Sequence, residues 1–396
     1  PRAHPQAAAG HERRERVHHR GDARHVARED EEAREGEQQP VVDLGERPAV
    51  EHGQHGDDRR HGRRSRLLDI VPDARRFIGV EMTGSETAVC LTDYRGRVLD
   101  RRAAPAPSRD YEENLDAACS MVRELLDRNG GADGLGFCVP GLVDSETGVL
   151  KVRPSYNWYD KPILRDIGRR LDLQYPVTVE NNACARAYGA SLFQRELLNN
   201  APTFAYLFIH AGIACPLILN TSSAFGSIVG AGEVGHMVME PNGPQCTCGN
   251  HGCLEAMFSE SQIKARLEES GKESCLLGRS AITFEDLGKA ALYKDPAAIH
   301  TLQKMARDLA LALSNLICIV NPELIILGGK GQHLGTLFIE EVQNSLRDVG
   351  FRRMVDFSGV RYSQLQSDAY LNGAMKYFFD TYYSFLEPRL CTFYIG

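Results

Sequence analysis

The chain has 396 residues, of which 42% are hydrophobic and 25% are charged, and its formal net charge is −7. This length allows two domains, and the composition is that of an ordinary folded protein. With this net charge, the chain as a whole has no excess of positive charge for binding polyanions, and no apolar run approaches the roughly 20 residues that span a bilayer. Eleven scattered cysteines without a disulfide-type spacing favour a reducing compartment. We therefore expect a cytoplasmic protein without a signal peptide or a membrane segment.

Residues 1–61 differ in composition from the rest of the chain. They hold eight of the 13 histidines and a single leucine, Leu44, and they lack Ile, Phe, Met, Tyr, Trp, Cys and Lys. Such a segment cannot bury enough apolar surface to offset the entropy lost on ordering, so we predict that it is disordered. Residues 62–76, GRRSRLLDIVPDARR, follow as a short basic linker, a type of run that is usually a solvated charged surface.

From residue 77 onward, apolar periodicity predicts alternating strands and helices. In the first half we expect strands at 77–81, 87–92, 97–101, 134–139 and 177–180, and helices at 111–128 and 163–171. The strand at 177–180 leads into Glu180–Asn181–Asn182 at the head of a further helix. The second half repeats the scheme, with strands at 204–210, 216–219 and 324–327 and helical segments at 259–267, 305–319 and 368–386.

Residues 232–255, GEVGHMVMEPNGPQCTCGNHGCLE, contain a dense group of metal-binding side chains. Cys246, Cys248 and Cys253 lie close together, and the intervening glycines permit the positive φ angles of a tight knuckle. His236 would complete a closed Cys3His tetrahedron, which is typical of structural zinc. The alternative is three reduced surface cysteines beside an unrelated histidine.

The same stretch resembles the signature of the ROK family (repressors, open reading frames and sugar kinases), GE-x-GH followed by C-x-CG-x2-GC-x-E. The resemblance covers about residues 62–386. It implies an α/β, two-lobed, actin-like ATPase and sugar-kinase (ribonuclease H-like) fold with a structural zinc loop. A small lobe at 77–195 would be completed by the closing helix at 368–386, and 196–367 would form a large lobe. The matching residues are Gly232, Glu233, Gly235, His236, Cys246, Cys248, Gly249, Gly252, Cys253 and Glu255.

The resemblance also implies a sugar pocket. Its expected contacts are Asn157, Asn181, Asn182, Glu233, His236 and Glu255. Family members are homodimers or dimers of dimers, and we expect the same assembly here.

Phosphoryl transfer needs a base, a cradle of backbone N–H groups and a carboxylate for magnesium, and all three are altered. The family's base aspartate is replaced by Asn182, whose amide cannot accept a hydroxyl proton. The first phosphate loop, D-x-G-G-T in kinases, reads EMTGS at residues 81–85, followed by Glu86. The second, G-T-G-I-G-x-G, reads HAGIACP at residues 210–216, where Pro216 has no N–H. We therefore predict no catalytic residue and no ATP or Mg²⁺, and interpret the adenine-side Gly328–Gly329 as a simple turn.

ROK regulators also carry a winged helix-turn-helix whose wing ends in a G-R-R-P motif. Gly62, Arg63 and Arg64, with the leucines and the proline that follow, resemble that ending, which implies that Arg63, Arg64 and Arg66 lie on DNA. Residues 1–61 occupy the helix-turn-helix slot, but a winged helix-turn-helix cannot be read in them. Either this head has been lost, or the sequence there does not represent the native reading frame.

Two functions follow from this pattern. The first is a sugar-responsive transcriptional regulator that binds a monosaccharide or a derivative without phosphorylating it and binds operator DNA. The second is an ATP-dependent sugar kinase of the glucokinase or N-acetylhexosamine kinase type, with Glu81 in place of the magnesium aspartate. A sugar-binding protein with neither activity is a third possibility.

Overall fold

The computed structural model describes residues 74–83, 85–172, 175–198, 201, 203–219, 222–223, 230–365, 371 and 373–374. The predictions for residues 1–61, and for Arg63, Arg64 and Arg66, lie outside these ranges, as does most of the expected helix at 368–386. In the part of the chain that is described, no helix is both long enough and apolar enough to cross a membrane.

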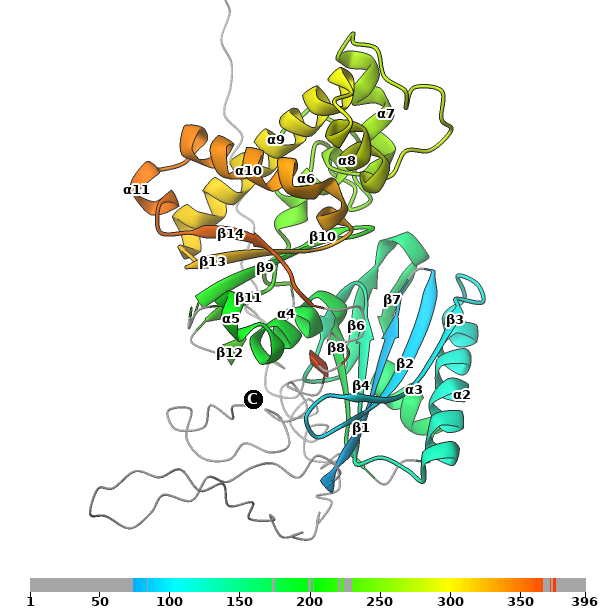
Figure 1. Cartoon of the computed structure of the whole chain (residues 1–396). Helices are drawn as coiled ribbons and strands as arrows, with labels where there is room; N and C mark the ends of the chain where they lie inside the picture. The colour runs from blue at the N-terminus through cyan, green and yellow to red at the C-terminus, as the bar shows by residue number, and fades with distance from the viewer. Residues whose placement is uncertain are drawn as a thin grey trace, which may run out of the picture. The chain divides into compact units, whose positions relative to one another are not determined.

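The first sheet has five strands in the order β3-β2-β1-β4-β8. Strands β1, β2 and β3 are antiparallel neighbours, whereas β4 and β8 run parallel to β1 (Figure 1). The bounds are β1 Arg76–Met82, β2 Glu86–Asp93, β3 Val98–Pro105, β4 Gly134–Val139 and β8 Val177–Asn181.

The second sheet repeats this topology. Its order is β12-β11-β9-β13-β14, with β11 antiparallel to β9 and with β13 and β14 parallel to it, and the short β10 pairs with β9 at the loop. The expected internal repeat is therefore confirmed. The bounds are β9 Thr203–Ile209, β10 Ile213–Ala214, β11 Leu217–Leu219, β12 Ser222–Ser223, β13 Leu324–Gly329 and β14 Gly359–Tyr362.

A small three-stranded sheet, which the sequence did not predict, follows β4. It is formed by β5 (Leu142–Asp144), β6 (Val149–Arg153) and β7 (Trp158–Lys161), in that order. The 3₁₀ turn η2 (Pro154–Tyr156) joins β6 to β7.

Helices α2 (Tyr111–Asn129) and α3 (Ile163–Arg170) pack on the first sheet through Leu115, Val122 and Ile167. Helix α2 begins where the Asp110 side chain accepts the Glu113 N–H at 3.0 Å. It ends at Gly130, whose positive φ of 73° releases the chain. Both helices agree closely with their predicted ranges.

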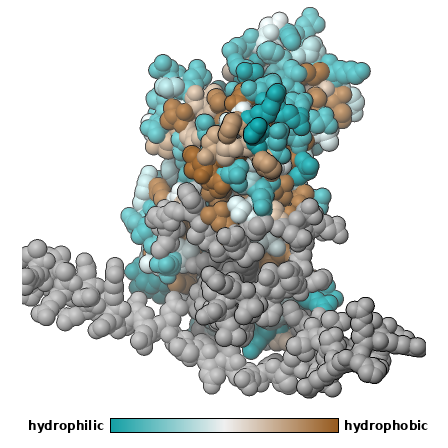
Figure 2. Space-filling model, turned by 90° about the vertical axis from the view of Figure 1, so that its left-hand side faces the viewer, coloured by the Kyte–Doolittle hydropathy of each residue, from teal (hydrophilic) through white to brown (hydrophobic). Residues whose placement is uncertain are grey.

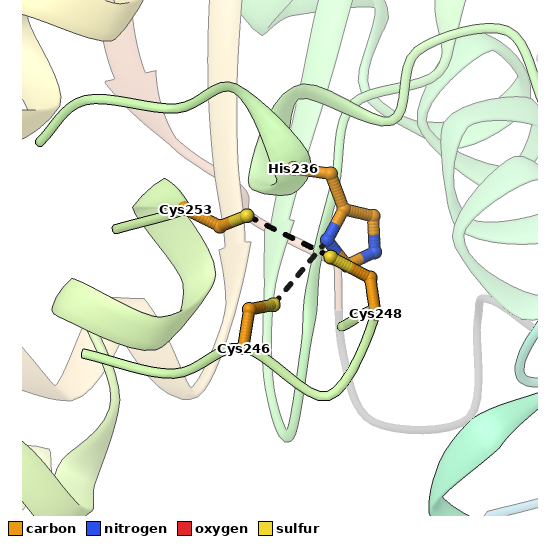
Figure 3. Close-up of side chains that lie close together, drawn as sticks. All are labelled: His236, Cys246, Cys248 and Cys253. Atoms are coloured by element: carbon orange, nitrogen blue, oxygen red, sulfur yellow. Dashed lines mark hydrogen bonds between the residues drawn. The ribbon is translucent and has the colours of Figure 1, made fainter. Parts of the chain in front are cut away.

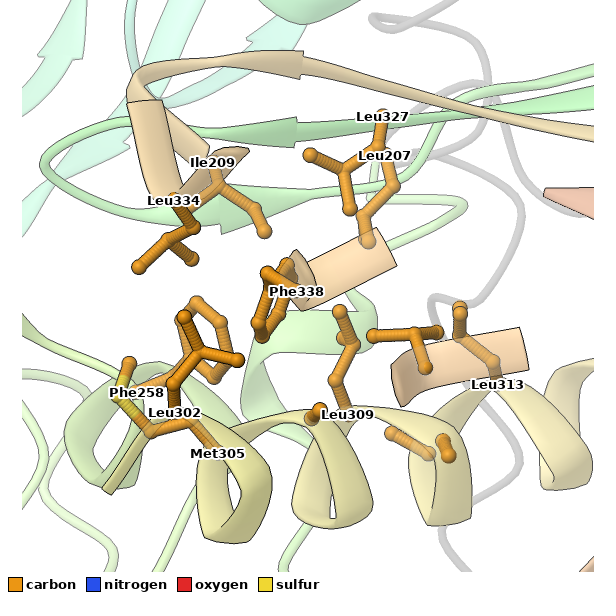
Figure 4. Packing of buried hydrophobic residues seen from close by; sticks show 14 of the residues in the cluster. Leu207, Ile209, Phe258, Leu302, Met305, Leu309, Leu313, Leu327, Leu334 and Phe338 are labelled. Carbon is orange, nitrogen blue, oxygen red and sulfur yellow. The ribbon is translucent and has the colours of Figure 1, made fainter. Parts of the chain in front are cut away.

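Long apolar helices cover one face of the second sheet (Figure 1). In α9 (Pro296–Val320), Leu302, Met305, Leu309 and Leu313 recur at three- and four-residue spacing and point towards the sheet (Figure 4). The other helical segments of this region are η3 Val234–His236, α6 Leu254–Met257, α7 Glu260–Glu269, α8 Phe284–Leu292, η4 Lys330–Leu334, α10 Gly335–Val349 and α11 Arg352–Val355. On the face of the molecule that bears α11, apolar residues are interspersed with hydrophilic ones (Figure 2).

Helix α4 (Asn182–Phe193), followed by the short α5 (Arg195–Leu198), contacts both sheets. Ala187 and Tyr188 of α4 pack with Tyr206 and other residues of the second sheet, whereas Ala185 packs with Cys138 of the first. Helix α4 is therefore a shared structural element of the two sheets.

The end of the described chain returns to the first sheet. A Cβ atom at Gly79 would lie 2.8 Å from the Leu371 carbonyl oxygen, and one at Gly136 would lie 2.6 Å from the Cβ of Ala374. Glycine is required at these two strand positions because the returning backbone lies directly against them.

Several elements differ from the prediction. Helix α9 begins at Pro296 and not at residue 305, because Asp295 caps it by accepting the Ala298 N–H at 2.9 Å and Pro296 suits the first turn. Helices α8 and α10 were not predicted. Strand β3 extends to Pro105, beyond the expected end at residue 101.

Candidate functional site

The cysteine-rich loop runs from η3 to α6 and folds back on itself. Backbone hydrogen bonds join Cys246 N–H to the Asn250 carbonyl and Leu254 N–H to the Met237 carbonyl, at 2.8 and 2.9 Å. Gly249 and Gly252 have φ angles of 98° and 66°, which glycine adopts without strain. The loop therefore returns its cysteines to the end of η3, where His236 lies.

The four predicted ligands come together (Figure 3). One donor atom from each of His236, Cys246, Cys248 and Cys253 lies within 4.8 Å of all the others. Cys246 Sγ is 3.6 Å from His236 Nδ1, and Cys248 Sγ is 3.7 Å from Cys253 Sγ. Zinc bonds of usual length in a tetrahedron place sulfur and nitrogen about 3.6 Å apart and two sulfurs about 3.8 Å apart. These residues can therefore hold a metal ion of that geometry.

The thiols differ in their ease of ionisation. The Asn250 N–H lowers the pKa of Cys248, whereas burial raises the pKa of Cys253, and its neighbouring thiols raise it further. Three adjacent thiolates repel one another unless a cation is bound between them, and a divalent metal supplies that charge. The donor set therefore fits a metal chemically as well as geometrically.

Two carboxylates flank this loop. Glu233 is half-buried, and burial raises its pKa, with the nearby Glu255 acting in the same direction and His236 opposing it. Glu255 Oε2 accepts the Ile213 N–H at 2.9 Å, and its Oε1 accepts the Thr247 hydroxyl at 3.4 Å. Glu233, His236 and Glu255 are thus electrostatic neighbours.

The loop after β9 uses several of its backbone donors internally. His210 N–H donates to the Gly212 carbonyl and Cys215 N–H to the Gly232 carbonyl, at 2.9 and 2.8 Å. The Ile213 N–H is taken by Glu255, and Pro216 has none. A phosphate needs several convergent N–H groups. At residues 210, 213, 215 and 216, the loop has no free backbone N–H group to donate to a phosphate.

The residues after β8 serve mainly to hold helix α4. Asn181 Oδ1 accepts the N–H groups of Ala183 and Cys184 at 2.7 and 3.2 Å, which makes Asn181 the N-cap of α4. Its Nδ2 donates to the Gly141 carbonyl at 2.7 Å and thereby fixes the turn after β4. Much of the hydrogen-bonding capacity of Asn181 is therefore used by the backbone.

Glu180 is a buried carboxyl group beside this cap. Its oxygens accept the Asn181 N–H at 2.6 Å and the Ser145 hydroxyl at 3.0 Å. Burial nevertheless raises its pKa to about 7, because desolvation of the charged form outweighs these hydrogen bonds. The Cys184 thiol lies in the field of both Glu180 and Glu233, which places the start of α4 near the metal loop.

The carboxylate of Glu81, at the end of β1, is held by α4. Arg186 Nη1 and Nη2 donate to the two Glu81 oxygens, and Asn182 Nδ2 donates to Oε1 at 3.3 Å. The Arg186 guanidinium also lies over the Phe208 ring, 4.4 Å from its centroid. The ring of His210 stacks on the same Phe208 ring, with 5.8 Å between the ring centroids. Burial and the nearby cations Lys330 and Arg186 lower the His210 pKa.

Aromatic side chains explain the two glycines at the end of β13. A Cβ at Gly328 would lie 2.3 Å from the Tyr206 hydroxyl, and one at Gly329 would lie 2.8 Å from the Phe208 ring. Gly329 also has a φ of 75°. Internal packing therefore requires both glycines.

Asn157, the remaining predicted sugar contact, is exposed at the end of η2 with a φ of 57°. Among the described residues, no side-chain hydrogen bond joins it to the other predicted sugar contacts. A shallow depression of about 570 Å³ at the start of α9 involves none of the predicted sugar or metal residues; it is lined by Glu273, Ser274, Cys275, Leu277, Asp295 and Pro296.

Sequence reasoning missed two functional side chains. Arg186 follows Asn182 by four residues on α4, so helical periodicity places both on one face. That spacing was readable, but its partner Glu81 is 105 residues away. Arg153, buried on β6, carried no sequence signal because it belongs to an unpredicted strand.

Comparisons with known proteins agree with this geometry. A profile described as the ROK family matches residues 77–380. The xylose repressor of Bacillus spizizenii is 30% identical over 270 residues, which are 67% of each chain. The glucokinase of Thermotoga maritima is 28% identical, over 76% of this chain and 96% of the glucokinase. A crystal structure of a ROK family transcriptional regulator, described as a homolog of the E. coli MLC protein, superposes with a TM-score of 0.68 at 25% identity and covers 76% of each chain.

Proposed function

We propose, because this chain belongs to the ROK family, that it is a sugar-responsive transcriptional regulator. In this proposal it binds a monosaccharide or a derivative of one without phosphorylating it. Relatives named xylose repressor, among them those of two Bacillus species, support the regulatory branch of the family.

The ion pair between Glu81 and Arg186 carries the proposal. Glu81 stands where the family's kinases keep the carboxylate that organises magnesium. Here both of its oxygens already accept hydrogen bonds from a guanidinium, and the amide of Asn182 occupies the position of the base. An amide has no basicity at neutral pH, and a neutralised carboxylate has little attraction left for Mg²⁺.

The sugar site in this proposal combines two groups of side chains. Glu233, His236 and Glu255 come from the metal loop, and Asn181 and Asn182 come from the start of α4. A neutral or anionic side chain pairs well with sugar hydroxyls, because each hydroxyl both donates and accepts. Asn157 is the sixth contact in this proposal, and its exposed side chain would bind a further sugar hydroxyl.

The metal in this proposal is zinc, held by His236, Cys246, Cys248 and Cys253. With four protein ligands it leaves no open position, so its role is to fix the loop and not to take part in a reaction. Since His236 Nδ1 faces the thiols, Nε2 remains available to donate a hydrogen bond to a sugar hydroxyl.

DNA binding forms the second part of the proposal. Arg63, Arg64 and Arg66 would contact operator DNA in a homodimer or a dimer of dimers, in which sugar changes the spacing of the two DNA-binding heads. Replacing the three arginines by alanine should weaken DNA retention and lower its salt dependence. Retention equal to that of the parent would contradict the wing assignment.

An ADP-release assay tests the catalytic part of the proposal. The whole chain is offered ATP, Mg²⁺ and, in turn, glucose, N-acetylglucosamine, N-acetylmannosamine, fructose and xylose, with the Thermotoga maritima glucokinase as the positive control. We expect no ADP above the sugar-free background, together with a sugar-dependent rise in Tm. Sugar-dependent ADP release would be the contrary outcome, and it would place this chain with its glucokinase relative. Sugar-dependent turnover that the Cys248→Ser variant loses would establish a kinase.

A further inference from the structure

Arg153 is a buried cation for which the described residues provide no counter-ion. It lies at the end of β6, only 4% of its surface is exposed, and its Nη1 has no hydrogen-bond partner. Among the described residues, no carboxylate forms an ion pair with it. Burial lowers its pKa to about 10, which shows how little the surroundings favour the charge.

Aromatic rings hold this guanidinium in place. The Tyr156 ring lies 3.7 Å and the Trp158 ring 4.7 Å from its central carbon, so the cation contacts the π faces of both. Trp158 is itself fixed, because its indole N–H donates to the Arg109 carbonyl at 2.9 Å. The rings orient the guanidinium but provide no in-plane acceptor, and Nη1 keeps its hydrogen-bonding capacity unused among the described residues.

The position of Arg153 connects it with the proposed sugar site. Asn157 lies between Tyr156 and Trp158 in the chain, and so it is flanked by the two residues that hold the guanidinium. On the other side, a Cβ at Gly141 would lie 3.1 Å from the Arg153 Cβ. The Gly141 carbonyl accepts from Asn181, a predicted sugar contact.

We propose that Arg153 receives an anionic group carried by the effector, so that the ligand is a phosphorylated or carboxylated monosaccharide and not a neutral sugar. This inference rests on the proposed sugar-binding function and narrows its ligand class. A phosphate or carboxylate oxygen supplies the acceptor that Arg153 Nη1 does not find among the described residues, and Arg is suited to both groups by its planar set of donors. Neutral sugars would leave the buried charge unpaired.

Isothermal titration calorimetry on the whole chain tests this inference. The probes are glucose, glucose 6-phosphate, glucuronate, N-acetylglucosamine and its 6-phosphate, xylose and xylose 5-phosphate, with inorganic phosphate alone as a control. We expect at least one anionic derivative to bind about tenfold or more tightly than its neutral parent, with an affinity that falls as NaCl is raised. The phosphate and carboxylate arms distinguish the two anions.

Matched variants assign the preference to a residue. Arg153→Gln should reduce the ratio of anionic to neutral affinity to within about twofold. Arg109→Gln is the control, because this exposed arginine lies 5.6 Å from the same Tyr156 ring and should leave the preference intact. If Arg153→Gln does not fold, Arg153→Lys keeps the charge without the planar donor set and should weaken the preference.

Three outcomes would overturn the inference. A neutral sugar that binds as tightly as its anionic derivatives contradicts it while leaving the proposed function standing. A preference that persists in the Arg153 variants assigns the anion to another residue. Binding of no sugar of either kind contradicts both the inference and the proposed function.

Discussion

The carboxylate of Glu81 and the guanidinium of Arg186 form a buried two-point ion pair between strand β1 and helix α4. Their side chains are only 3% and 13% exposed. Because Arg186 also lies over Phe208 of the second sheet, this one side chain contacts both sheets. The pair therefore links the two sheets, and in the proposed function it also occupies the carboxylate that a kinase would offer to magnesium.

Removing one partner of this pair should destabilise the protein strongly. Arg186→Met leaves the Glu81 charge buried and unpaired, which costs about 3–5 kcal/mol. The double variant Glu81→Gln with Arg186→Met should recover much of that loss, since no charge then remains buried. Urea denaturation of the parent, both single variants and the double variant gives the coupling free energy. Single losses that simply add in the double variant would show that the two charges do not interact.

Removing the metal should loosen the loop. We expect one zinc per chain by elemental analysis, and we expect a chelator or Cys248→Ser to lower Tm by at least about 5 °C, as each kcal/mol is worth roughly 2 °C in a large domain. Cys275→Ser is the matched control, because Cys275 is also exposed and lies outside the cluster. Equal Tm values for the two serine variants would contradict a structural metal.

Restoring the base alone should not restore phosphoryl transfer. In Asn182→Asp a carboxylate replaces the amide, but Arg186 still binds Glu81, and Glu255 still holds the Ile213 N–H of the second loop. We expect no ADP above the sugar-free background, measured beside the active glucokinase. ATP consumption by this variant would show that Asn182 was the single missing part.

Glu180 should make stability depend on pH. Its pKa is about 7 in the folded chain and about 4.3 when unfolded, so the folded state holds the proton more tightly. This contribution to stability is fully present below about pH 4 and is lost as pH rises to about 7, by at most about 4 kcal/mol. Glu180→Gln should flatten that fall, because glutamine keeps an acceptor for the Asn181 N–H and a donor for Ser145. Identical pH profiles of unfolding free energy for the two proteins would contradict the raised pKa.

Sequence reasoning succeeded where the determinants are local. The four ligands of the cysteine-rich loop lie within 18 residues, and the glycines between them already imply a chain that folds back. Strand β4 and helix α2 were found because their apolar patterns match a single period over their whole length. The repeated order of strands and helices along the chain also predicts that the second sheet has the topology of the first.

The missed features depend on contacts between distant segments. The sequence gives no reason to pair Arg186 with Glu81, and it explains Gly328 only once Tyr206 is known to lie against it. The early start of α9 is a different case, because Asp295–Pro296 is a recognisable helix start that was overlooked. Strands β5–β7 are short, and their alternation is too brief to stand out.

The close approach of Leu371 and Ala374 to Gly79 and Gly136 bears on how the protein is made. Strand β1, the first strand of the described chain, receives its contact at Gly79 from Leu371, which is translated almost 300 positions later. Until then a nascent polypeptide lacks this contact, and incompletely covered apolar surface attracts chaperones and favours misassembly. A stop codon placed before residue 371 would remove the contact permanently.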